Sequence, residues 1–196
     1  MLKSIRYSLL PALLIVLLAS FTLTGNGEGD KEDEQTAEIE WISIEEAFEL
    51  NNGKKKKHHK KIIIDFYTDW CGWCKRMDKT TFSNPQVVEY INENYHAVKF
   101  DAEQRDELTV NGNTYGFRPG GRRGGTHELA LALAVDNGRI GYPTLAILDE
   151  EGAKLLTAPG YKTAQQLDVL LNYYGSDHHK DLDLEAFKRV YSSPVK

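Results

Sequence analysis

One stretch holds both cysteines of this 196-residue chain: Ile62-Ile63-Ile64-Asp65-Phe66-Tyr67-Thr68-Asp69-Trp70-Cys71-Gly72-Trp73-Cys74-Lys75. Its first six residues are apolar on both faces of a strand except at Asp65, which predicts a buried central strand. Because there is no other cysteine, the chain cannot build a disulfide framework or a four-thiolate zinc site from its own residues. The pair is therefore predicted to cycle between dithiol and disulfide, and an inert structural pair or half of a zinc site is the alternative.

The two-residue spacing of the cysteines suits thiol exchange. If the strand ends near Thr68 and a helix starts inside the motif, Cys71 lies at the helix N-terminus, where unpaired N–H groups and the helix dipole favour a thiolate. We therefore expect Cys71 to be the nucleophile. Cys74 follows one turn later on the same side, and we expect it to resolve a mixed disulfide formed on Cys71.

Two separate motifs resemble the thioredoxin-like superfamily. Residues Ile63 to Lys75 look like the active-site segment of the thioredoxins, and Tyr142-Pro143-Thr144 looks like their cis-proline turn. The stretch Lys79 to Val87 is similar to the C-terminal thioredoxin-like domain of the bacterial membrane disulfide-reductant transporter. This resemblance spans residues 38–175 and implies an α/β fold, a three-layer α/β/α sandwich with a central mixed sheet.

The resemblance implies catalytic roles beyond the cysteines. Asp65 matches the buried acid that assists proton transfer at the resolving cysteine of thioredoxins, and burial should raise the pKa of its carboxyl. Lys99 matches the lysine that pairs with this acid in many thioredoxins. The alternatives are a solvated aspartate at a strand end and a surface lysine at an edge position.

A second group of residues is expected to bind the substrate. The resemblance implies a cis peptide bond at Pro143, beside the cysteines, where the backbone of Tyr142 can pair with an extended substrate strand. Four more residues are assigned to substrate contact or to close approach of its backbone: Trp70, Gly72, Trp73 and Gly160. Ordinary packing or turn geometry is the alternative for these positions.

The N-terminal residues are predicted to serve export. Lys3 and Arg6 precede an apolar stretch from Leu9 to Leu23, which predicts a signal peptide or an uncleaved membrane anchor over residues 1–24. Residues 25–37 are acidic and poor in apolar side chains, which predicts a flexible linker. Both alternatives place the following domain outside the cytoplasm, in the periplasm of a bacterium.

An insert of residues 111–125 interrupts the domain before Pro143. It is predicted to be a glycine- and arginine-rich loop at one rim of the active site, followed by a helix starting near Thr126. Its arginines are candidates for contacts with an acidic partner: Arg118, Arg122 and Arg123. A mobile surface insertion is the alternative.

The extension of residues 176–196 carries a short amphipathic stretch that is predicted to dock on the domain: Leu182, Leu184, Phe187 and Val190. The run from Lys54 to Lys61 predicts a solvated loop, with contact to anionic lipid or another polyanion as the minority alternative. The pairs His58-His59 and His178-His179 lack companion ligands at a suitable spacing, so neither a metal site nor a cofactor is expected.

The resemblance implies an extracytoplasmic thiol–disulfide oxidoreductase that reduces protein disulfides through Cys71 and Cys74. Its expected partners are protein thiols and disulfides and a membrane-embedded electron donor, and a monomer is expected. The net charge of −5 argues against a nucleic-acid surface. The alternatives are an envelope dithiol oxidase or isomerase, and an adaptor or chaperone without redox turnover. Because the dipeptide Gly72-Trp73 affects redox poise, the sequence leaves the direction of electron flow open.

Overall fold

The structure is a computed structural model that describes residues 38–121 and 124–195. The predicted signal peptide or anchor, the predicted linker and the predicted roles of Arg122 and Arg123 lie outside the described residues. Within the described part of the chain, no helix is both long and apolar enough to cross a membrane.

A five-stranded mixed sheet forms the centre of the domain, with the strand order β1-β3-β2-β8-β9. The first three of these strands run parallel, and the last two run antiparallel to their neighbours. The strands are β1 (Trp41–Ile42), β2 (Lys61–Tyr67), β3 (Tyr95–Asp101), β8 (Thr144–Leu148) and β9 (Lys154–Pro159).

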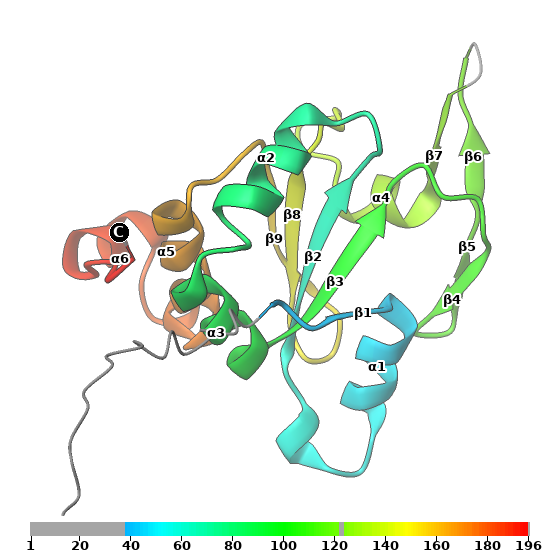
Figure 1. Ribbon diagram of the computed structural model, residues 1–196. Helices are drawn as coiled ribbons and strands as arrows, with labels where there is room; N and C mark the ends of the chain where they lie inside the picture. The colour runs from blue at the N-terminus through cyan, green and yellow to red at the C-terminus, as the bar shows by residue number, and fades with distance from the viewer. Residues whose placement is uncertain (1–37, 122–123, 196) are drawn as a thin grey trace, which may run out of the picture. The chain divides into compact units, whose positions relative to one another are not determined.

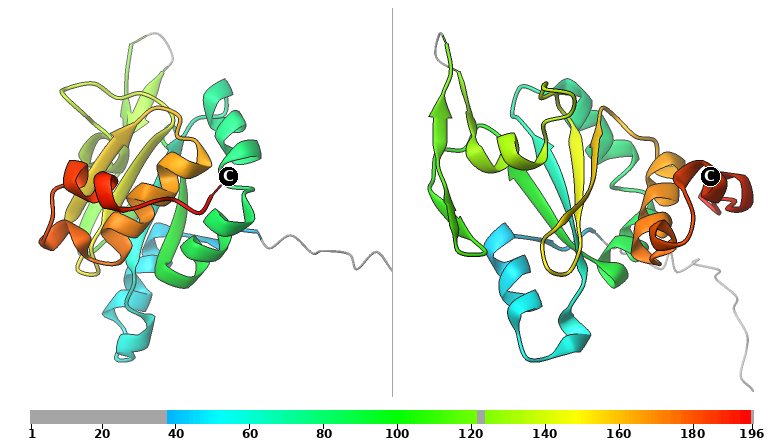
Figure 2. Two further views of the ribbon diagram at one scale, coloured as in Figure 1. Left: turned by 90° about the vertical axis from the view of Figure 1, so that its left-hand side faces the viewer. Right: turned by 180° about the vertical axis from the view of Figure 1, so that it is seen from behind.

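Helices cover both faces of this sheet (Figures 1 and 2). One layer contains α1 (Ile44–Asn52) and α4 (Glu128–Leu133), and the other contains α2 (Gly72–Thr80), α3 (Pro85–Asn94) and α5 (Ala164–Gly175). The predicted three-layer α/β/α sandwich is therefore confirmed.

Strand β2 lies in the middle of the sheet and is buried from Lys61 to Phe66. Ile62 and Ile64 pack into the core shared with α1 and α4, whereas Ile63 packs into the core shared with α2, α3 and α5. Because side chains alternate along a strand, Asp65 faces the same layer as Ile63, where α2 carries the cysteines. The run of apolar residues from Ile62 to Tyr67, interrupted only by Asp65, predicted that this strand is buried.

The insert differs from the loop that we expected over 111–125. It folds into two small antiparallel sheets, which pair β4 (Leu108–Val110) with β5 (Asn113–Tyr115) and β6 (Phe117–Pro119) with β7 (Gly125–His127). Asn111 and Gly112 take positive φ angles of 48° and 76°, which is the geometry of the two-residue turns that close β-hairpins. The helix expected near Thr126 begins at Glu128, and the side chain of His127 caps it.

The connection between α1 and β2 contains the lysine run. It includes the short 3₁₀ helix η1 (Lys56–His58), and Lys54 to Lys57 are exposed, as predicted for a solvated loop. The prediction is wrong for Lys61, which is the first residue of β2, is buried, and pairs with Glu150 and Asp177. The ring of His59 bonds the carbonyl oxygen of Gly53 at 2.9 Å. In the described residues no group of three or more His, Cys, Asp or Glu side chains could hold a metal ion.

The C-terminal extension packs against α5 through η2 (His178–Lys180) and α6 (Leu184–Val190). Phe187 and Val195 are buried in the core on this side, while Leu182 and Val190 are exposed. The amphipathic stretch therefore docks through Phe187 and the partly buried Leu184, and not through Leu182 and Val190. The hydroxyl of Tyr191 donates to the buried carboxylate of Asp168 at 2.9 Å, which joins the end of the chain to α5.

The substitution Tyr191→Phe should lower the free energy of unfolding by about 1–3 kcal/mol, because it leaves one buried carboxylate oxygen of Asp168 without its donor. Chemical denaturation of the full chain measures this difference. Tyr115→Phe is the control, since its hydroxyl makes no side-chain hydrogen bond within the described residues. Equal losses of unfolding free energy in both variants would mean that the hydrogen bond from Tyr191 to Asp168 does not hold the extension in place.

Candidate active site

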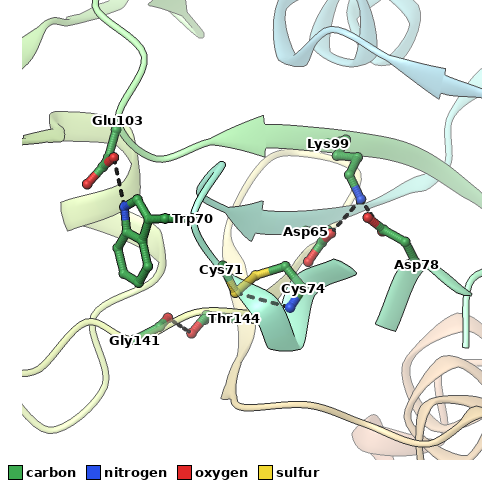
Figure 3. Close-up of a disulfide and its surroundings, with 9 residues drawn as sticks. All are labelled: Asp65, Trp70, Cys71, Cys74, Asp78, Lys99, Glu103, Gly141 and Thr144. Atoms are coloured by element: carbon green, nitrogen blue, oxygen red, sulfur yellow. Dashed lines mark hydrogen bonds and ion pairs between the residues drawn. A yellow bond between two sulfur atoms is a disulfide. The ribbon is translucent and has the colours of Figure 1, made fainter. Parts of the chain in front are cut away.

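Cys71 and Cys74 form a disulfide at the start of α2, and both residues are buried (Figure 3). Cys71 is the N-cap residue of the helix, where the sequence predicts it. Its Sγ accepts a hydrogen bond of 3.1 Å from the backbone N–H of Cys74. An N–H donor aimed at this sulfur stabilises negative charge on it, so a reduced Cys71 is the better placed of the two to form a thiolate.

Asp65 lies on β2 behind the disulfide (Figure 3). Asp65 is 1% exposed, and its Oδ1 makes no hydrogen bond to the described residues. Burial raises the pKa of Asp65 to about 6, against the lowering effect of the nearby Lys99 ammonium. A carboxyl with this pKa can take up and release a proton near neutral pH.

Lys99 lies opposite Asp65 in the register of β2 with β3, and its Nζ is 3.1 Å from Asp65 Oδ2. Strand β3 is internal to the sheet, so the alternative of an edge lysine is wrong. Lys99 also pairs with Asp78 of α2, a residue that the sequence analysis missed. Burial alone would lower the pKa of Lys99, but the two carboxylates outweigh it and the pKa is raised.

Lys99 and Asp78 border a hollow in the surface, whereas Asp65 is not among the residues that line it. The hollow, of about 330 Å³, is lined by Trp41, Phe82, Asp78 and Lys99, among others. The Lys99 ammonium also lies 5.2 Å from the centre of the Trp41 ring and 5.5 Å from that of Phe82. Lys99 therefore lies between the buried acid and this hollow.

The Tyr142–Pro143 peptide bond is cis. The carbonyl oxygen of Pro143 accepts a hydrogen bond of 2.7 Å from the N–H of Gly160, which has a φ of 84° that favours glycine. The hydroxyl of Thr144 donates to the carbonyl oxygen of Gly141 at 2.7 Å (Figure 3). The first bond joins the turn to the residue after β9, and the second closes the turn on itself.

Trp70 and Trp73 are 68% and 56% exposed, which is unusual for tryptophan. The indole N–H of Trp70 donates to Glu103 at 3.0 Å, and its ring meets Tyr142 edge to face with centroids 6.0 Å apart. The ring of Trp73 lies 5.7 Å from that of Tyr161.

Gly72 lies between the two tryptophans in sequence, and a Cβ atom built on it would meet no other atom within 4 Å. The surface around the disulfide is thus open and aromatic. The sequence analysis assigned Trp70, Gly72 and Trp73 to it and missed three residues that flank them: Arg76, Glu103 and Tyr161.

A C-x-x-C disulfide at a helix N-cap, over a buried acid and beside a cis-proline turn, is the site of a thiol–disulfide oxidoreductase. Comparison with known proteins agrees with this class. Residues 49–175 match the family model described as a thioredoxin-like domain, and the chain belongs to this family.

Individual relatives carry names that fit the same chemistry. The disulfide bond reductase DsbH of Chlamydia pneumoniae is 28% identical over 120 residues, which are 61% of each chain. The thiol:disulfide interchange protein DsbD of Photorhabdus laumondii is 31% identical over 115 residues, 59% of this chain and 15% of that one. DsbD of Salmonella typhi is 32% identical over 65 residues, so the match covers 33% of this chain and only 12% of the relative.

A solved thioredoxin-fold protein from Helicobacter pylori superposes with a TM-score of 0.53. It is 19% identical, and the match covers 75% of this chain and 95% of the other, which supports the fold alone. The family match and the named relatives confirm the predicted enzyme class. The chain is a thioredoxin-like disulfide oxidoreductase.

Asp65→Asn should make the protein more stable than the wild type at neutral pH. A pKa of about 6 in the fold, against an ordinary 3.8, means that the stability contributed by the protonated acid is complete below pH 4 and is lost as the pH rises through 6. The stability advantage of the variant should therefore grow between pH 4 and pH 7, by up to roughly 3 kcal/mol, because the pKa of about 6 already includes the pairing with Lys99.

Chemical denaturation of the oxidised protein at several pH values measures this difference. Asp69→Asn, at an exposed position, removes the same charge and serves as the matched control. If the free energies of unfolding of the wild type and of Asp65→Asn differ by the same amount from pH 4 to pH 7, the raised pKa of Asp65 is contradicted.

Proposed function

We propose that this protein reduces disulfides of exported proteins by dithiol–disulfide exchange. The observation that carries the proposal is the placement of Cys71 Sγ at the N-cap of α2, where it accepts the Cys74 N–H, with the buried carboxyl of Asp65 behind the pair. The Sγ of Cys71 is thus placed to attack a substrate disulfide, and Asp65 has a pKa suited to accept the proton of the Cys74 thiol.

The reaction begins with the reduced enzyme. The Cys71 thiolate attacks one sulfur of the substrate disulfide, which forms a mixed disulfide and releases the other substrate sulfur as a thiolate. Asp65 accepts the proton of the Cys74 thiol, and the Cys74 thiolate then attacks Cys71 Sγ. The second substrate sulfur leaves, the enzyme disulfide forms, and two electrons have passed to the substrate. Asp65 afterwards returns its proton to solvent by way of Lys99 and Asp78, which line the hollow.

Two observations favour reduction over oxidation. Neither residue between the cysteines is cationic, so the helix N-terminus is the main source of thiolate stabilisation, and a strongly oxidising pair needs a more stabilised reduced form. The Chlamydia pneumoniae relative is named a disulfide bond reductase. A dithiol oxidase or isomerase is the competing function.

The location and partners follow from the sequence. The basic residues before an apolar stretch at Leu9 to Leu23 support export to the periplasm, with the protein either secreted or tethered by an uncleaved segment. A reductase outside the cytoplasm needs a supply of electrons across the membrane, so a membrane-embedded donor is the proposed partner. The protein is proposed to act as a monomer.

Reduction of insulin with dithiothreitol as electron source tests the proposal. The wild type should accelerate precipitation of the insulin B chain, and Cys71→Ser should reduce the acceleration to the background rate. Cys74→Ser should accumulate a mixed disulfide with the substrate, because the thiol that releases it is missing. Electrophoresis without reductant detects this adduct.

The equilibrium with a glutathione buffer separates reduction from oxidation. A reductase should have a potential below that of the glutathione pair, near the roughly −270 mV of thioredoxin. A potential near the roughly −120 mV of a strong oxidant would contradict the proposed direction. Faster labelling of Cys74 than of Cys71 at neutral pH would reverse the assigned roles of the thiols.

A further inference from the structure

Arg76 lies on the exposed face of α2, two residues after Cys74 and one turn after Trp73. Its guanidinium carbon is 5.2 Å from the centre of the Trp73 ring and 5.5 Å from that of Tyr161. Both rings attract the cation through their electron-rich faces. These three residues form what we call the Arg76 platform.

The Arg76 platform carries a charge with no acidic partner in the described residues. No carboxylate there lies within ion-pair distance of Arg76, and Asp78, two residues later on α2, pairs with Lys99 instead. A guanidinium is planar, always charged and able to donate two parallel hydrogen bonds to one carboxylate. Contact with the rings orients this group and reduces the entropy lost when it binds a partner.

Hydrogen bonds attach the Arg76 platform to the proposed substrate-binding turn. The hydroxyls of Tyr161 and Thr80 are 2.9 Å apart, and Thr80 also donates to the backbone oxygen of Arg76 at 2.9 Å. Tyr161 directly follows Gly160, whose N–H bonds the carbonyl oxygen of Pro143. A peptide that pairs with the backbone at Tyr142 would therefore pass near the guanidinium.

The opposite rim of the site has the reverse charge. There Glu103 accepts the indole N–H of Trp70, and Asp69 is exposed beside it in sequence. A substrate carboxylate would be attracted on the Arg76 side and repelled on the Glu103 side. The charges around the disulfide can thus distinguish partners.

We propose that the Arg76 platform binds the carboxylate of an aspartate or glutamate close to the reacting cysteine of the protein partner. The inference rests on the proposed function and adds to it the class of preferred substrate, a cysteine with an acidic side chain nearby. Arg76 is then a specificity-determining residue.

A series of short peptides tests this inference. Each peptide contains one cysteine, joined through a disulfide to thionitrobenzoate, and a single glutamate that is moved through the two positions on either side. The reduced full-length protein transfers two electrons to each peptide disulfide, releasing coloured thionitrobenzoate and the peptide thiol while Cys71 and Cys74 form their disulfide. No other cysteine of the chain competes, because these are its only two.

The measured quantity is the ratio of second-order rate constants for each glutamate peptide and its glutamine counterpart. For at least one position the ratio should be about two to five, as expected for one exposed ion pair, and it should fall as salt is added. Arg76→Gln should bring the ratio to about one, and Arg76→Lys should restore part of it, because the charge returns without the planar group.

Lys79→Gln is the matched control, since it removes a positive charge from an exposed position of the same helix. It should leave the ratio unchanged. Ratios near one at every position in the wild type would overturn the inference, as would an equal loss in Lys79→Gln and Arg76→Gln. If the wild-type protein gives ratios near one but still reduces insulin, only this inference fails. If the wild-type protein does not reduce insulin, the proposed function fails.

Discussion

The burial of Asp65 next to Lys99 is the interaction on which the site depends. A carboxylate in the core is costly unless a cation and hydrogen bonds compensate it, and here the register of β2 with β3 places Lys99 opposite Asp65. The pairing is incomplete, because Asp65 Oδ1 has no partner among the described residues. This incomplete compensation keeps the pKa of the acid near neutrality, which is what a proton acceptor for Cys74 requires.

The sheet also determines how the separate parts of the site meet. Strand β2 leads into the cysteines, β8 begins directly after the Tyr142–Pro143 turn, and β9 ends at Pro159, just before Gly160, whose N–H bonds that turn. The insert joins the same end of the sheet, because the N–H of His127 donates to the oxygen of Ala102 and the N–H of Ala102 donates to that of Tyr67. A change in strand register would therefore displace the acid, the turn and the base of the insert together.

Much of this arrangement could be predicted because its signals are local. The apolar run of β2, the spacing of the cysteines and the turn at Pro143 each lie within a few residues. The hairpins of the insert were missed because their strands have three residues each, too few for a periodic pattern, although Asn111-Gly112 is a strong turn signal. Asp78 could have been found from its position one helical turn after Cys74. Tyr161 could not, because it meets α2 only through the fold, 81 residues away from its partner Thr80.

The ionisation of Asp65 is the most direct test of the whole account. Carboxyl carbon NMR of the oxidised full-length protein, with the resonance assigned by its absence in Asp65→Asn, measures the titration of this one group. The account predicts a midpoint of about 6. A midpoint near the ordinary 3.8 would contradict it, because a carboxyl with that pKa is not held in the buried environment that makes it a proton acceptor for Cys74.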